Sequence, residues 1–234
     1  MQLRLLSGGA AQGLVEALAP RFKAETGSTI AGSFGAVGSM RDKLLAGEPA
    51  DLVLLTSAII AELVRQGWVV ASSASDIGRV HTAVAVRAGE PLPAIDTPDR
   101  LRAALLAADA IYFPDPQQAT AGIHFAKVLR ELGIAGEVLA GKARSHPNGA
   151  TAMRALASSS ARRPIGCTQA TEISNTSGLS LLGPLPAPFA LATVYTAGVS
   201  ARASAPRQAE ALSALIRAPD TAGIRSQSGF EGLP

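Results

Sequence analysis

Three polar side chains of this 234-residue chain are of types that bind carboxylates or move protons. Arg41 follows a glycine-rich stretch, and its guanidinium can pair a carboxylate through two parallel hydrogen bonds. His124 stands in the first turn of an expected helix, where the dipole favours a neutral imidazole that can donate to a carboxylate or transfer a proton. His146 precedes an expected turn. Each could equally be a solvated or half-buried residue, so their role depends on the elements that position them.

Two further reactive residues have a functional and a structural interpretation. Lys127 lies one turn after His124 and is typical of a solvated helix face. Cys167 ends an expected strand before an expected helix, where a thiol's pKa can fall, although a single buried cysteine commonly serves packing. No metal-ligand spacing, phosphate loop or serine-hydrolase elbow occurs, so we predict no metal and no cofactor.

The elements around Arg41 are organised by the stretch from Phe34 to Thr56. This stretch indicates a glycine-rich turn, a short helix, a tight break and then a buried strand. Gly35 and Gly38 let the backbone approach a ligand closely, and Ser39 is a candidate N-cap. A helix start with unpaired N–H groups is a ready anion site. The alternative interpretation is an ordinary connection between a strand and a helix in an α/β sheet.

The rest of the chain alternates strands and helices, which predicts parallel sheets covered by helices. The expected strands are 3–6, 29–34, 52–55, 79–87, 110–113, 164–167, 179–182 and 190–199. The expected helices are 11–25, 58–65 with Ser57 as its cap, 97–106, 120–132, 149–157, 168–174, 205–216 and 220–225. This order predicts two α/β lobes, residues 1–80 with 195–234 and residues 81–194, joined by two crossover strands, with a ligand between the lobes at helix N-termini.

Composition limits the classes of partner. Hydrophobic residues are 47% and charged residues 17%, as in a compact globular protein. Aromatic residues are only 4% and the net charge is +3 with scattered Lys and Arg, so we predict no nucleic-acid partner. No apolar run is long enough for a membrane span. No leader is present, so we expect a periplasmic protein if a leader has been removed and a cytoplasmic one otherwise.

Several stretches together resemble the periplasmic molybdate-binding protein family, the type II solute-binding proteins of ABC transporters. They cover nearly the whole chain, and the most specific are the Ala-Gly-x-Pro-Ala-Asp-Leu run and the Asp-Pro…Ala-Gly-Ile run. In order, the stretches are Ser7–Ala10, Phe34–Ser39, Leu45–Leu52, Asp115-Pro116 with Ala121–Ile123, Leu129–Gly133, Pro164–Cys167 and Gly229-Phe230. The resemblance implies a two-lobed α/β fold of the type II periplasmic-binding-protein class.

The resemblance also implies a site of serine hydroxyls, backbone N–H groups and a tyrosine hydroxyl around a tetrahedral oxyanion. The two serines fall on Gly9 and Val37, and the tyrosine falls on Cys167, so three side-chain donors are absent. The second-lobe backbone donors fall near Ala121 and Gly149. Because a dehydrated dianion needs nearly every oxygen paired, we expect a different ligand. Small residues in the loops leave room for a larger organic acid.

We therefore predict a solute-binding protein for a small anion, more specifically an organic di- or tricarboxylate, delivered to an ABC-transporter permease. One alternative is an enzyme similar to aconitate isomerase, with His124 and His146 moving the proton. A second is a molybdate- or tungstate-binding transporter component, in which neighbouring hydroxyls replace the missing ones. The predicted ligand contacts are Ser7, Gly8, Gly9, Ala36, Val37, Gly38, Ser39, Arg41, Ala121, Gly122, His124, Gly149, Cys167 and Thr168.

Overall fold

The structure, a computed structural model, describes residues 1–232. The chain divides into two compact units, one made of Met1–Val80 with the chain from Thr193 onward, the other of His81–Ala192. The chain leaves the first unit within strand β4 (Ser75–Arg87) and returns to it in β9 (Ala192–Val199). Within residues 1–232, no helix is both long and apolar enough to span a membrane.

The sheet of the first unit has the strand order β2-β1-β3-β9. Its strands besides β9 are β1 (Gln2–Gly8), β2 (Thr29–Gly35) and β3 (Leu52–Thr56). β1 runs parallel to β2 and β3, as predicted, whereas β9 is antiparallel to β3. The register sets Gly8 opposite Gly35. The ends of β1 and β2, and the loops that follow them, therefore lie side by side.

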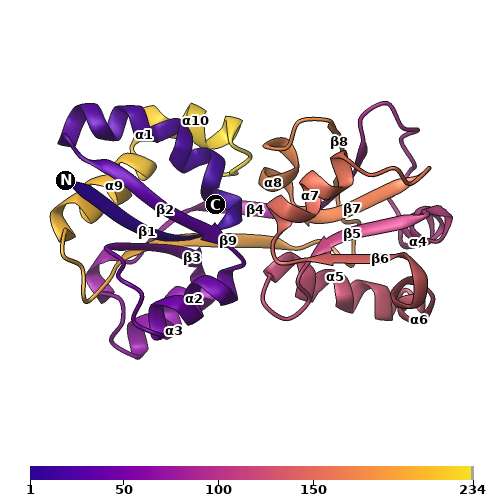
Figure 1. The fold of residues 1–234 in the computed structure, drawn as a ribbon, viewed down its shortest axis with the longest axis horizontal. Coiled ribbons are helices and arrows are strands. Elements are labelled where there is room, and N and C mark those ends of the chain that lie inside the picture. Colours follow the sequence, from indigo (N-terminus) through magenta and orange to yellow (C-terminus); the bar gives the residue numbers. More distant parts are fainter. Residues whose placement is uncertain (233–234) are drawn as a thin grey trace. The chain divides into compact units, whose positions relative to one another are not determined.

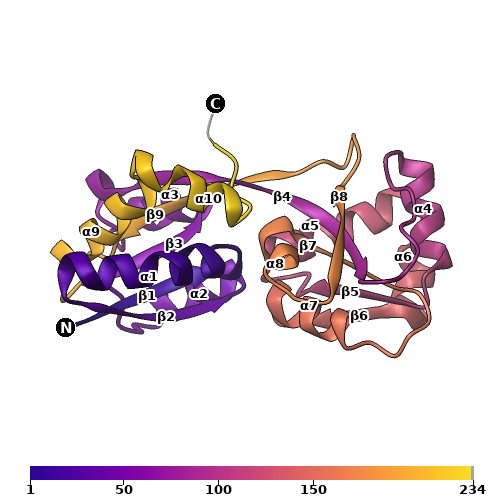
Figure 2. The same ribbon diagram turned by 90° about the horizontal axis from the view of Figure 1, so that it is seen from above.

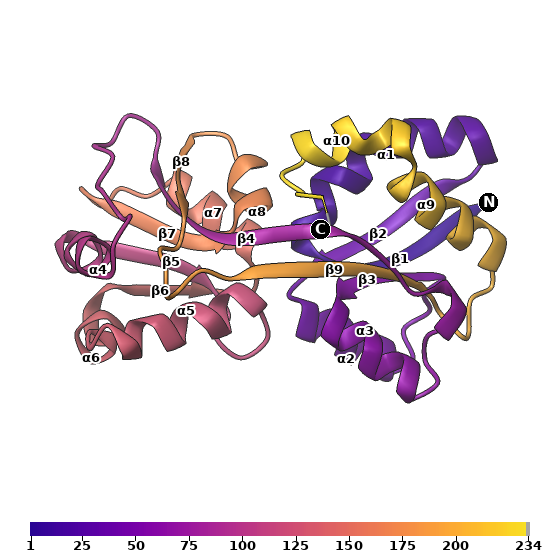
Figure 3. The same cartoon turned by 180° about the vertical axis from the view of Figure 1, so that it is seen from behind.

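Helices cover both faces of this sheet (Figures 1 and 3). α1 contacts α9 and α10 on one face, where their ribbons run beside one another in Figure 2; α2 and α3 cover the other. Leu14, Leu18 and Phe22 of α1 are buried, as their helical spacing predicts. Burial of each such side chain contributes about 1.5–3 kcal/mol. The helices are α1 (Gln12–Thr26), α2 (Val37–Leu45), α3 (Ser57–Arg65), α9 (Pro206–Arg217) and α10 (Ala222–Gln227).

The second unit is built on the strand order β4-β7-β5-β6, with β8 paired to β4. β5 is parallel to β6 and β7, and β4 is antiparallel to β7. The strands are β5 (Ala110–Pro114), β6 (Ala143–His146), β7 (Pro164–Gln169) and β8 (Leu179–Pro184). Parallel strands end at one edge of a sheet, so β5 and β7 present their last residues together.

Two apolar clusters cover the two faces of this second sheet. Val84, Cys167 and Phe125 belong to the cluster beneath α4 and α5, and Ala85 and Met153 belong to the cluster beneath α7 and α8. α5 and α7 lie on opposite faces in Figure 1. The helices are α4 (Pro98–Ala107), α5 (Thr120–Glu131), α6 (Ala135–Glu137), α7 (Gly149–Ala157) and α8 (Ala170–Ser174), with a π-helical turn at Val138–Lys142.

Several strands are longer than predicted, such as β1, β4 and β8, and two further differences lie in the second unit. β6 was not predicted, because this edge strand is short and its Ala-Arg-Ser-His sequence is half exposed. α8 begins at Ala170 rather than at Thr168, because β7 continues to Gln169, two residues beyond the predicted end at Cys167. Gln169 is therefore the last residue of β7.

Candidate functional site

In the first unit, the candidate site is formed by the loops after β1 and β2. Gly9 opens a 3-10 turn directly after β1. Ala36 is the N-cap of α2 and has extended backbone angles, and across the described chain no side chain hydrogen-bonds to this helix start. The first turn of α2 also lacks an acidic residue. Its N–H groups therefore remain available to a bound anion.

Gly8, the last residue of β1, lies close to Val37 at the start of α2 and to Tyr195 of β9. A Cβ placed on Gly8 would come 2.8 Å from Cγ1 of Val37 and 3.0 Å from Cε1 of Tyr195. The Ser7 hydroxyl, fully buried, donates to the Gly8 carbonyl at 3.0 Å. The sequence did not single out Tyr195, which lies in the apolar run of β9 and packs edge-on against Phe230. Tyr195 therefore lies next to these loops, although the sequence did not predict it as a site residue.

Ser39 and Arg41 lie farther along α2 than predicted. The helix begins at Val37, so Ser39 is in the first turn and Ala36 occupies the N-cap position in its place. The reason is that β2 ends at Gly35 and leaves a single extended residue before the helix. Arg41 pairs with its neighbour Asp42, Nη2 to Oδ1 at 2.7 Å, and its side chain is about one-third exposed. Gly38 is buried in the same first turn.

In the second unit, the start of α5 is the corresponding open helix end. Ala119 is its N-cap, and no side chain within residues 1–232 caps this end. Ala121 and Gly122 are buried in its first turn. A Cβ on Gly122 would come 2.3 Å from the carbonyl oxygens of both Pro114 and Asp115, so only glycine lets α5 rest on the end of β5.

His124, on α5, has a structural partner. Its Nε2 lies 2.7 Å from the Phe189 carbonyl oxygen, so the ring donates an N–H there. This hydrogen bond ties α5 to the turn before β9. The other ring nitrogen, Nδ1, is the one that could exchange a proton with a ligand. Lys127 pairs with Glu131 at 3.5 Å and is largely exposed, in agreement with a solvated helix face.

His146 ends β6 and stacks on Tyr112, with ring centroids 5.9 Å apart and planes inclined by 22°. Burial lowers the pKa of His146, which favours the neutral imidazole. A neutral imidazole can accept a proton, as the isomerase alternative requires.

The start of α7 differs from those of α2 and α5 because other side chains of the protein hydrogen-bond to its N–H groups. Asn148 forms a capping box with Thr151, and the buried carboxyl of Glu172 accepts hydrogen bonds from Thr168 at 2.6 Å and from the Ala150 N–H. A Cβ on Gly149 would come 1.9 Å from Oε2 of Glu172. Gly149 and Thr168, both predicted as ligand contacts, therefore contact Glu172. Burial raises the pKa of Glu172 against the hydrogen bonds that favour its charge.

Cys167 is a core residue. It is fully buried in the apolar cluster with Val84 and Phe125, and burial raises the pKa of its thiol. Of the two interpretations drawn from sequence, packing describes this cysteine, and the expected lowering of its pKa does not occur. The last residue of β7 is Gln169. It was not predicted as a site residue, because the predicted strand ended two residues earlier.

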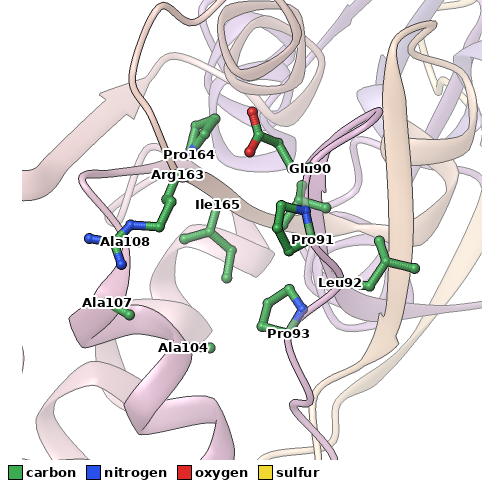
Figure 4. Close-up of a pocket in the computed structure, with 11 residues that line it drawn as sticks. Glu90, Pro91, Leu92, Pro93, Ala104, Ala107, Ala108, Arg163, Pro164 and Ile165 are labelled. Carbon is green, nitrogen blue, oxygen red and sulfur yellow. The ribbon is translucent and has the colours of Figure 1, made fainter.

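A separate apolar pocket of about 170 Å³ lies in the second unit (Figure 4). None of the predicted site residues lines it. Its lining is mostly apolar, which is a poor match for an anion. The lining residues are Val86, Glu90, Pro91, Leu92, Pro93, Ala104, Ala107, Ala108, Arg163, Pro164 and Ile165.

Comparison with known proteins gives the family. A family model described as bacterial extracellular solute-binding protein matches residues 3–231. The chain belongs to this family. An aconitate isomerase from a Pseudomonas species is 27% identical, over 99% of this chain and 88% of that protein.

Solved structures give the fold. The periplasmic molybdate-binding protein of Azotobacter vinelandii has a TM-score of 0.83 at 21% identity, covering 99% of both chains. The sulfate-binding protein SubI of Mycobacterium tuberculosis has a TM-score of 0.77 at 19% identity, covering 100% of this chain and 87% of that one. These likenesses confirm the predicted type II periplasmic-binding-protein fold.

Proposed function

We propose that this family member captures a small organic di- or tricarboxylate and does not bind molybdate. The observation that carries the proposal is the pair of uncapped helix starts, α2 in the first unit and α5 in the second, each lined by small residues. Backbone N–H groups at such starts favour anions. The adjoining positions Gly9 and Val37 supply no hydroxyl.

The lack of hydroxyls supports a carboxylate over a compact oxyanion. Each unpaired polar group in a dehydrated site costs roughly 1–3 kcal/mol. The Ser7 hydroxyl is turned to the Gly8 carbonyl and the Thr168 hydroxyl to Glu172, so in these arrangements neither replaces a missing donor. A carboxylate spreads its acceptors over a longer molecule and can use backbone donors alone, with Arg41 as an added cation.

A thermal-shift panel of molybdate, tungstate, sulfate and di- and tricarboxylates tests the proposal. A ligand at about 100 times its Kd adds about 2.7 kcal/mol of stability, which corresponds to a rise in Tm of roughly 5–10 °C for a chain of this size. We expect that rise from a carboxylate. Arg41→Ala should weaken binding about tenfold, while Lys43→Ala, on the same helix and paired to Glu48, leaves binding unchanged. A large shift from molybdate alone would contradict the proposal.

A second candidate function is an isomerase that shifts a proton along an allylic tricarboxylate. The full-length similarity to an aconitate isomerase favours it, and His124 and His146 supply the ring nitrogens. Incubation with cis- or trans-aconitate, followed by separation of the isomers, tests it. Conversion that is lost in His124→Asn or His146→Asn, while aconitate still binds to the variant, supports the enzyme. Tight binding of aconitate without conversion eliminates it.

We also propose that the native protein works outside the cytoplasmic membrane and passes its ligand to a transporter permease, in agreement with the family to which it belongs. Cell fractionation of the native gene product tests the location, and recovery in the cytoplasm alone would contradict it.

A further inference from the structure

Two polar side chains that lie opposite each other in the second unit have no hydrogen-bond partner among residues 1–232. Gln169 is 3% exposed, and within residues 1–232 neither its Oε1 nor its Nε2 has a hydrogen-bond partner. Thr82 is fully buried, and its hydroxyl is likewise unpaired. β4 and β7 pair Thr82 directly with Gln169. Both side chains therefore emerge on the same face, next to each other.

Such an arrangement needs an explanation, because buried polar groups in folded proteins are nearly always paired. A carboxamide without partners is more costly to bury than a hydrocarbon of the same shape. The next pair inward on this face, Val84 and Cys167, is apolar, so the polar atoms of Gln169 and Thr82 lie at the end of an apolar face.

The fold places Gln169 beside the open start of α5. β7 is parallel to β5, with Tyr112 opposite Gly166. Continued for three residues, to just past the end of β5 at Pro114, this register brings Asp115 level with Gln169. The first turn of α5 rests on the Asp115 carbonyl at Gly122. Gln169 lies on the α5 side of the sheet because it is two residues after Cys167 on the same strand, and Cys167 packs in the cluster beneath α5.

We infer that the Gln169 carboxamide and the Thr82 hydroxyl, together with the N–H groups at the start of α5, form a recognition site for a hydroxylated organic acid. The carboxamide presents an N–H donor and a carbonyl acceptor in one plane. A ligand that satisfies both must offer an acceptor oxygen and an O–H. Sulfate and molybdate dianions offer only acceptors and leave Oε1 unpaired. The inference rests on the proposed function and narrows its ligand to acids that carry a hydroxyl.

Matched ligand pairs test this assignment by isothermal titration: malate against succinate, and citrate against tricarballylate, each pair differing by one hydroxyl. The wild-type protein should bind a hydroxylated member at least tenfold more tightly than its partner. Gln169→Met keeps the length of the side chain and removes both polar atoms. This variant should lose at least tenfold in affinity for the hydroxylated acid and bind both members of a pair alike, with an apo Tm no lower than that of the wild type.

Thr171→Val is the matched control, because it removes another fully buried, unpaired hydroxyl two residues away; ligand affinity should not change. Gln169→Glu is the second variant, should Gln169→Met fold poorly. It keeps the shape and adds a negative charge, so it should abolish acid binding. Unchanged affinity in a folded Gln169 variant overturns the inference alone. Wild-type protein that binds none of the acids overturns the proposed function and the inference with it.

Discussion

At the scale of single residues, the fully buried carboxylate of Asp51 shows how the first unit closes. It accepts hydrogen bonds from the Arg4 and Ser204 N–H groups at 2.8 Å and from the Ala205 N–H at 3.0 Å. Burial alone would raise the pKa of Asp51, but the bonds from Arg4, Ala205 and Ser204 outweigh burial and lower the pKa to about 2. The residue joins the N-terminal strand to the segment that leads into α9.

The depressed pKa of Asp51 predicts a pH-dependent contribution to stability. A shift of roughly two units is worth about 2.5 kcal/mol, present above the unfolded pKa near 4 and lost as the pH falls from about 4 to about 2. Asp51→Asn should therefore lower the free energy of unfolding by about 2–3 kcal/mol at pH 7, and by clearly less at pH 3. Urea titrations at both pH values measure the difference.

Asp42→Asn serves as the control for this prediction, because Asp42 is an exposed partner of Arg41 and its loss should change stability by less than about 1 kcal/mol. An equal loss of stability in the Asp51 variant at pH 7 and pH 3 would contradict the assignment.

The contacts of some residues could be predicted from the sequence and those of others could not. The Ala-Asp-Leu run marked Asp51 as part of a family motif, yet its partners Ser204 and Ala205 lie about 150 residues away, and no local pattern identifies them. For Cys167 the sequence left packing and reactivity open, because the strand was expected to end at this residue. Because β7 continues for two more residues, Gln169 and not Cys167 ends the strand, with both side chains on the same face.

At the scale of elements, periodic helices were predicted closely. α7 has the predicted bounds, and α3 ends at the predicted Arg65 but begins at Ser57, which was expected to be its cap. Their apolar spacing and flanking glycine or asparagine suffice. What occupies each helix start was not predictable. α2 and α5 are open, whereas α7 is closed by Glu172 from α8, an element that follows it in the chain. The state of a helix end depends on its tertiary neighbours, which the local sequence does not contain.

The closed start of α7 predicts that Gly149 tolerates no larger residue. In Gly149→Ala, the added methyl would meet Oε2 of Glu172 at 1.9 Å and Oγ1 of Thr168 at 2.2 Å, and both partners are buried. We expect a loss of about 1–3 kcal/mol, as for overpacking elsewhere. Chemical denaturation of the purified variant measures it.

Gly223→Ala is the paired control, because Gly223 is helical and a Cβ there meets nothing within 4 Å. That substitution should stabilise the protein by about 0.4–1 kcal/mol. A Gly149→Ala protein as stable as the wild type would show that Glu172 does not sit against α7.

At the scale of the whole molecule, the two units differ in how the chain builds them. The second unit is one continuous segment, His81–Ala192, whereas the first needs Met1–Val80 and the chain from Thr193 onward. β9 completes the first sheet by pairing with β3 along Leu52–Thr56, and α9 packs on α1. Residues 1–80 alone would expose one edge of β3 and the apolar face of α1.

This difference predicts that the two fragments behave differently in isolation. Residues 81–192 keep both apolar clusters and should fold cooperatively, whereas residues 1–80 should not. Circular dichroism with urea titration of each fragment measures this, and adding a fragment of residues 193–234 to residues 1–80 should restore a cooperative transition, because it returns β9 and α9. Cooperative unfolding of residues 1–80 by themselves would mean that the returning chain is dispensable to the first unit. The discontinuous unit depends on distant segments for its sheet edge and its helix layer, so its stability is linked to the late part of the chain as Asp51 is linked to Ser204.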